Sequence, residues 1–312
     1  MSRPQSPAHT LATRVLVLFS LMLLLSLLPS CSHTSAEEQE YSRIASLSEQ
    51  EAFRQAVQEL RAEGVSVNFG SQPPYEKSYY NEVRPENNPM ASNPTWSQVV
   101  EFLEADQTDS HVYLRGIYDC ASFAETLHDA AEVAGIRCAF VAIRFVGDSV
   151  GHALNAVFTT DLGWALVNSM GRDGLDFLRP MDPASLLARA EARAQDPFAD
   201  WSGDCVAYAA IGQELGFVHL QFAESLDYAF YQGCRSRRQA YELTLNQYNR
   251  DVQSYNDWVR GRVFYQGTPD ASRMRSWSAE LDARDAALQR ERLTLGPVYQ
   301  PMGIVDGIDV YF

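Results

Sequence analysis

The first repeated apolar pattern in the body of the chain has the spacing of a helix. Its apolar side chains are Phe53, Val57 and Leu60. Gly64 follows this stripe, so we predict a first helix over residues 47–63. The same spacing predicts a second helix from residue 96 to about residue 106. Several prolines and tyrosines separate the two helices, which indicates an irregular crossing.

The central part of the chain changes from a helical to a strand pattern. A helix is predicted to start at Cys120 and to end at Gly135, because apolar residues recur there at helical spacing. A β-rich run follows over residues 137–145. His152 opens a second predicted strand, and Asn168 lies near the end of a third.

Toward the C-terminus the pattern becomes that of long amphipathic helices. Apolar and aromatic residues alternate spacings of four and three at Tyr241, Leu245, Tyr248, Val252, Tyr255 and Val259. A break at residues 267–270 precedes a weaker stripe, which predicts an antiparallel helical hairpin. Either the hairpin covers the sheet of the body or it forms an arm, and we favour the arm. The tail, residues 304–312, alternates in β fashion and predicts a final strand.

The first 30 residues have the pattern of an export signal. Two arginines precede an apolar run, residues 15–28, which is shorter than the roughly 20 residues of a membrane span. Residues 28–31 resemble a bacterial lipobox, which implies that Cys31 becomes a lipidated N-terminus. An ordinary signal peptide or an uncleaved anchor is the alternative. We therefore expect an exported protein, lipid-anchored on the outer face of the cytoplasmic membrane.

Charge narrows the classes of partner. The whole chain has a formal charge of −15, and without residues 1–30 it has 23 basic and 40 acidic side chains, a charge of −17. This balance argues against nucleic acid and against anionic lipid surfaces, so we expect membrane contact through the lipid anchor only. The apolar fraction of 46% is sufficient for a substantial core.

The remaining cysteines and histidines give no metal signature. There is no HExxH motif, no paired CxxC and no glycine-rich phosphate loop, so we predict neither a metal nor a cofactor. Cys138 lies on a predicted strand and is expected to be buried. Cys205 and Cys234 form a possible disulfide, because an exported protein permits one.

Cys120 has the position of a nucleophile. Unpaired N–H groups and the helix dipole favour a thiolate at a helix N-terminus. The carboxylate of Asp119, the expected N-cap, disfavours a second negative charge beside it and therefore opposes the thiolate. A base is needed to remove the thiol proton. His152 is the candidate base. Asn168, across a two-strand turn, is expected on the same side of the sheet, where it could orient the imidazole.

These residues carry a resemblance to the transglutaminase-like superfamily, which has a papain-like cysteine fold. The matching positions are Cys120, Phe123, Ala124, Gly135, Ile136, Arg137, Gly151, His152 and Ala153. The resemblance covers roughly residues 93–175. It implies a Cys-His-Asn triad, with Asn168 in the place where the superfamily usually has aspartate and papain-type enzymes have asparagine.

We therefore expect an α+β fold with a papain/transglutaminase-like core and an appended C-terminal helical hairpin. The expected divisions are a signal peptide (1–30), a tether (31–43), an N-terminal helix and crossing (44–92), the core (93–234), the hairpin (235–296) and a C-terminal strand (297–312).

The expected activity is acyl transfer or hydrolysis at an amide bond of a protein, peptide or cell-wall peptide. In this mechanism the Cys120 thiolate attacks the carbonyl and His152 transfers the proton. One alternative is a catalytically inactive scaffold that binds a protein or glycan at the envelope. Another is an NlpC-type cell-wall peptidase, which also begins a helix with a cysteine.

Overall fold

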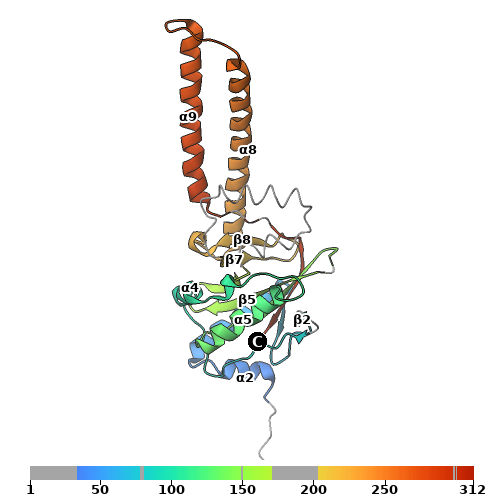
Figure 1. Ribbon diagram of the computed structural model, residues 1–312. Helices are drawn as coiled ribbons and strands as arrows, with labels where there is room; N and C mark the ends of the chain where they lie inside the picture. The colour runs from blue at the N-terminus through green and yellow to red at the C-terminus, as the bar shows by residue number, and fades with distance from the viewer. Residues whose placement is uncertain (1–33, 78–80, 149, 171–202, 298, 300) are drawn as a thin grey trace, which may run out of the picture.

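The computed structural model describes residues 34–77, 81–148, 150–170, 203–297, 299 and 301–312. These residues form an α+β body from which two long helices extend (Figure 1). The expected signal peptide and Cys31 lie outside the described residues.

A mixed sheet of seven strands forms the centre of the described body. The strands are β1 (Ser66–Asn68), β4 (Ala139–Phe145), β5 (His152–Thr159), β6 (Gly163–Asn168), β7 (Cys205–Tyr208), β8 (Gly216–His219) and β9 (Val305–Tyr311). Their order is β1-β9-β4-β5-β6-β7-β8, and only β1 and β9 pair in parallel. The predicted C-terminal strand is confirmed as β9, which lies inside the sheet between β1 and β4. A separate two-stranded sheet joins β2 (Glu76–Lys77) and β3 (Asn81–Glu82).

The predicted helices of the body begin where their capping residues indicate. The body helices are α2 (Ala36–Ser42), α3 (Leu47–Ala62), α4 (Trp96–Ala105) and α5 (Cys120–Val133), with 3-10 turns η2 (Thr108–Ser110) and η3 (Leu220–Phe222). Ser46 and Thr95 accept hydrogen bonds from backbone N–H groups in the first turns of α3 and α4. Gly64 follows α3 with a φ of 89°, a conformation that favours glycine.

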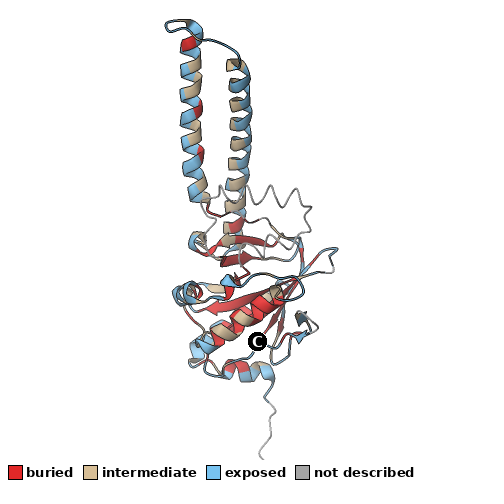
Figure 2. Ribbon diagram, in the orientation of Figure 1, coloured by how far each residue is buried: buried red, intermediate tan, exposed pale blue. Residues whose placement is uncertain are grey.

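Both faces of the sheet are covered. On one face, Phe53 of α3 packs in an apolar cluster with Val141 of β4. On the other face, Leu127 of α5 and Leu103 of α4 pack in a second cluster with Val157 of β5. Figure 2 shows the resulting buried layer through the body. Every residue of β5 is buried, because helices pack on both of its faces.

The expected tether at residues 31–43 contains a packed helix, which corrects that expectation. Tyr41 of α2 is buried, and its ring lies 5.7 Å from the ring of Phe53. The acidic composition indicated solvent exposure, but the acidic residues of this segment have arginine partners. Arg54 and Arg61 of α3 bind the carboxylates of Glu38 and Glu37. The segment is therefore part of the body from Ala36 onward.

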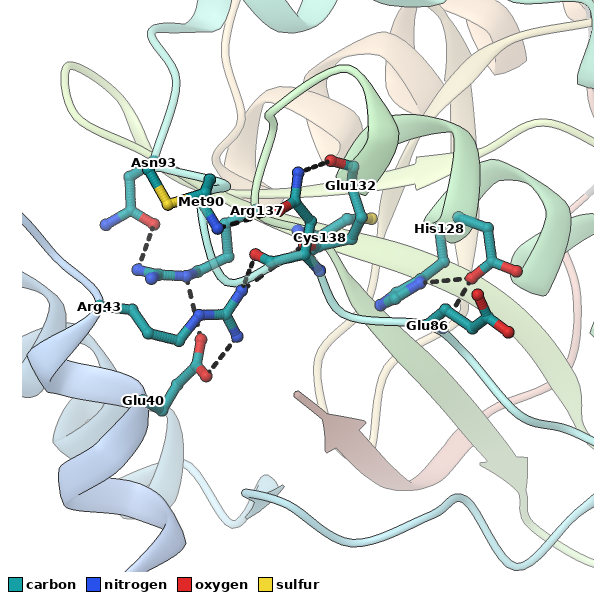
Figure 3. A network of polar contacts seen from close by, with 11 residues as sticks. Glu40, Arg43, Glu86, Met90, Asn93, His128, Glu132, Arg137 and Cys138 are labelled. Atoms are coloured by element: carbon teal, nitrogen blue, oxygen red, sulfur yellow. Dashed lines mark hydrogen bonds and ion pairs between the residues drawn. The ribbon is translucent and has the colours of Figure 1, made fainter.

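A buried ionic network joins α2 to the end of α5 and the start of β4 (Figure 3). Glu40 binds Arg43 at 2.6 Å and Arg137 at 3.0 Å. Glu132 accepts hydrogen bonds from the backbone N–H groups of Cys138 and Asn88. Arg137, part of the Gly-Ile-Arg resemblance, is 1% exposed and has a structural role here.

The two long helices form an arm. They are α8 (Tyr228–Val259) and α9 (Pro269–Leu295), and they pack against each other (Figure 1). Leu281 and Leu288 of α9 are buried in the seam. α8 begins seven residues before the expected boundary at residue 235, because its first turns belong to the body, where Tyr231 stacks on Tyr208. Within the described residues, no helix combines the length and the apolar character that crossing a membrane requires.

Candidate functional site

Cys120 occupies the predicted position at the N-terminus of α5. Asp119 is the N-cap, and its carboxylate accepts a hydrogen bond from the backbone N–H of Ser122 at 3.3 Å. Cys120 is half-buried and packs among apolar side chains that include Ala124 of α5 and Ala153 of β5. The thiol therefore lies between α5 and the sheet.

The surroundings of Cys120 favour the neutral thiol. Burial raises its pKa to about 11, and the carboxylate of Asp119 adds to that increase. A hydrogen bond from the backbone N–H of Ala153 acts in the opposite direction but is the smaller effect. The helix dipole was expected to favour a thiolate, but desolvation is the larger influence on this pKa. Cys120 is consequently protonated at neutral pH.

His152 and Asn168 form a buried pair, as the sequence predicted. His152 Nε2 and Asn168 Oδ1 are 2.8 Å apart, and both residues are at most 2% exposed. Burial lowers the pKa of His152 to about 4, although the Asn168 hydrogen bond partly opposes this shift. His152 is therefore neutral at pH 7, and Nε2 donates its proton to the amide oxygen of Asn168.

The alternation of β5 places His152 on the face of the sheet away from α5. Ala153 and Val157 belong to the apolar clusters beneath α5, whereas Leu154 and Phe158 belong to the cluster beneath α3. Because side chains alternate along a strand, His152 shares the face of Leu154.

Neighbouring strands support this placement of His152 and Asn168. His152 pairs in register with Ile143, and its ring lies 6.0 Å from the ring of Phe217. Asn168 pairs in register with Cys205. Residues paired in an antiparallel sheet point to the same face. Ile143, Phe217 and Cys205 all belong to the cluster on the α3 face.

The structure therefore assembles two members of the expected triad and separates the third. Cys120 lies on the α5 face, and His152 with Asn168 lies on the α3 face. No hydrogen bond connects the thiol to the imidazole among the contacts of the described residues, and His152 Nδ1 is buried without a hydrogen-bond partner there. In this arrangement His152 cannot accept the thiol proton. Of the expected Cys-His-Asn triad, the structure thus shows the His152–Asn168 pair and, among the contacts of the described residues, no contact of that pair with Cys120.

The polar side chain of β5 that does face the cysteine helix is Asn155. Its Nδ2 donates to the backbone oxygen of Ala124 at 2.8 Å, so it anchors α5 on the sheet. Sequence reasoning missed this residue because both faces of β5 are buried. A strand covered on both faces lacks the alternation of polar and apolar residues that shows which side chains share a face.

The possible disulfide between Cys205 and Cys234 is also corrected, because both thiols are free. Cys205 is buried in the core, and its sulfur donates to the backbone oxygen of Gly203 at 3.2 Å. Cys234 lies on α8 at a cavity of about 180 Å³, where Arg237 donates to its sulfur. The two side chains have different surroundings, one in the core and one at the base of the arm.

Comparison with protein-family models, with curated proteins and with solved structures finds no match to this chain. Among the described residues there is no group of three histidine, cysteine, aspartate or glutamate side chains that could hold a metal ion.

Proposed function

We propose that this protein is a non-catalytic scaffold of the cell envelope, in which a diverged transglutaminase-like body carries a helical arm. The observation that supports this proposal is the separation of Cys120 from His152 by the sheet. Both amide-bond chemistry and an NlpC-type peptidase need a thiol and a base on the same side. The scaffold needs only a stable body and an accessible surface for a protein or glycan.

The order of the elements supports a diverged core. A cysteine begins α5, which packs on antiparallel strands that carry His152 and Asn168 in the order that the resemblance implies. In this proposal His152 and Asn168 contribute to the packing of the α3 face. Their hydrogen bond satisfies one buried polar atom of each side chain, whereas His152 Nδ1 and Asn168 Nδ2 are buried without a hydrogen-bond partner among the described residues.

Alkylation of Cys120 tests the proposal. Iodoacetamide labelling would be followed against pH by mass spectrometry of the peptide that contains Cys120. We expect slow labelling that rises only above pH 8.5, because burial raises the thiol pKa. His152→Ala should leave the midpoint unchanged, and Asp119→Asn should lower it, because the carboxylate of Asp119 opposes the thiolate.

A midpoint below pH 8.5 that moves upward in His152→Ala would establish an activated dyad and overturn the scaffold proposal. A parent midpoint near 11 with no response to His152→Ala supports it. Cys234, which is half-buried, is an internal reference for reagent activity in the same sample.

We also propose that Cys31 carries the lipid that anchors the body. The lipobox-like residues 28–31 support this assignment. Membrane fractionation of a Cys31→Ser variant tests it, because loss of the lipid should release the exported body or leave an uncleaved precursor. A variant of mature size that stays in the membrane fraction would show that another feature anchors the protein.

A further inference from the structure

The end of the arm farthest from the body has a positive formal charge, whereas the rest of the protein is acidic. We define the arm tip as residues 255–277, which comprise the distal ends of α8 and α9 and the loop between them (Figure 1). The tip contains four arginines and two aspartates, a formal charge of +2, so the rest of the chain carries −17. The basic residues are Arg260, Arg262, Arg273 and Arg275.

The arm tip also exposes apolar and aromatic side chains. Val263 is 75% exposed and Tyr265 is 71% exposed, whereas their neighbour Phe264 packs on Trp258 with ring centroids 5.2 Å apart. Trp258 in turn lies 5.9 Å from Trp277 of α9. The aromatic cluster thus connects the two helices, and the loop displays Val263 and Tyr265 outward.

Two of the tip arginines lie beside the aromatic cluster. The guanidinium carbons of Arg262 and Arg273 are 5.2 and 5.0 Å from the ring centroid of Trp258. Arg260 pairs with Asp257, but both side chains are more than half exposed, so that pair is weak. Positive charge is therefore available around the exposed Val263 and Tyr265.

The length of the arm separates this charge from the acidic body. Between the first turns of α8, which belong to the body, and the tip lie residues 232–254 of α8, which correspond to roughly 35 Å of helix. Charges in water at physiological ionic strength are screened over about 8 Å. An anionic surface at the tip therefore interacts with the local positive charge and is shielded from the acidic charges of the body. The net charge of the chain, which argued against anionic lipid, does not describe the tip.

We propose that the arm tip docks on the surface of an anionic phospholipid bilayer. Tyr265 and Val263 enter the headgroup layer, where aromatic and apolar side chains replace contact with water by contact with lipid. The arginines pair with lipid phosphates, and each basic residue near an anionic surface strengthens binding about fivefold. This inference depends on the tip alone and goes beyond the proposed scaffold function. Because α2 and the tip lie at opposite ends of the molecule (Figure 1), the bilayer at the tip is a different one from the membrane that the proposed Cys31 lipid enters.

Vesicle flotation tests the proposal with a chain that begins at Ser32, which retains every described element of the fold. The vesicles would contain phosphatidylcholine alone or with 30% phosphatidylglycerol, a composition chosen to give roughly the surface charge of anionic membranes. We expect binding to the anionic vesicles that decreases in 0.5 M salt. The double variant Val263→Asp with Tyr265→Asp should bind at least tenfold more weakly. Arg262→Glu should weaken binding by about tenfold or more, because it removes one attraction and adds a repulsion.

Leu243→Asp is the matched control, because Leu243 is 71% exposed and lies on α8 outside the arm tip. It should bind like the parent, and circular dichroism should show the same helix content in all variants. The proposal is overturned if the parent binds both vesicle types equally, or if the tip variants bind like the parent. Concentration-dependent dimers without vesicle binding, lost in the same variants, would assign the tip to a second copy of the chain instead.

Discussion

The buried, neutral state of His152 makes the stability of the body sensitive to mild acid. The unfolded imidazole has a pKa of 6.5, and the folded one has a pKa of about 4. Between pH 6.5 and about pH 4, His152 is protonated in the unfolded chain and neutral in the folded chain. The contribution of neutral His152 to the unfolding free energy is therefore fully present above pH 6.5 and is lost as the pH falls toward 4.

The magnitude follows from the size of the shift. One pKa unit corresponds to about 1.4 kcal/mol, so the full shift is worth roughly 3 kcal/mol below pH 4. Between pH 7 and pH 5, we expect the unfolding free energy to fall by about 2 kcal/mol through this residue alone. This is a large part of the 5–15 kcal/mol that is typical for a whole domain.

Urea denaturation at pH 7 and at pH 5, followed by tryptophan fluorescence, measures the effect. Other groups also titrate over this range, so the comparison is with His152→Gln, in which the loss between the two pH values should be about 2 kcal/mol smaller than in the parent. His152→Phe is a second such variant in case the amide does not fit. His111→Gln is the control, because His111 is exposed and should keep the parental loss. Equal losses in the parent and in both His152 variants would refute the buried neutral imidazole.

Three further predictions concern other buried groups. Leu288→Ala should lower the urea midpoint of the arm by the equivalent of about 2–5 kcal/mol, because Leu288 is only 4% exposed in the seam. Burial and the charge of Asp109 raise the pKa of Asp204 to about 8 in the folded protein. Between pH 4 and pH 8 the folded chain therefore keeps a proton on Asp204 that the unfolded chain has lost, and the unfolding free energy falls as the pH rises through this range. In thermal melts at pH 8, Asp204→Asn should therefore melt above the parent, and it should lose less stability between pH 6 and 8. Glu132→Ala should cost about 3–5 kcal/mol of unfolding free energy in urea titrations, because it removes a buried carboxylate that pairs with Arg43 at 3.6 Å and accepts two backbone hydrogen bonds. An unchanged midpoint would show that the network adds nothing.

Local patterns in the sequence determined most helices and several strands. The apolar stripe before Gly64 and the capping residues Ser46 and Thr95 act within one or two turns, so their consequences can be predicted without the fold. The same holds for Cys120 as the first residue of α5. The hairpin spacing likewise reflects contacts between neighbouring residues of one helix and its partner.

The tertiary structure decided which of these residues meet. The acidic segment around Glu40 is part of the body because arginines distant in sequence, Arg54, Arg61 and Arg137, pair with its carboxylates. β9 entered the sheet beside β4 through a pairing that spans more than 150 residues.

The relation of Cys120 to His152 was also decided at this level. A shift of one residue along a strand turns a side chain to the opposite face, and β5 is buried on both faces, so the sequence has no polarity signal that fixes this choice. By itself the sequence determined that a thiol begins a helix and that a histidine and an asparagine lie on neighbouring strands. Only the packing of α5 and α3 on opposite faces decided that the sheet lies between them.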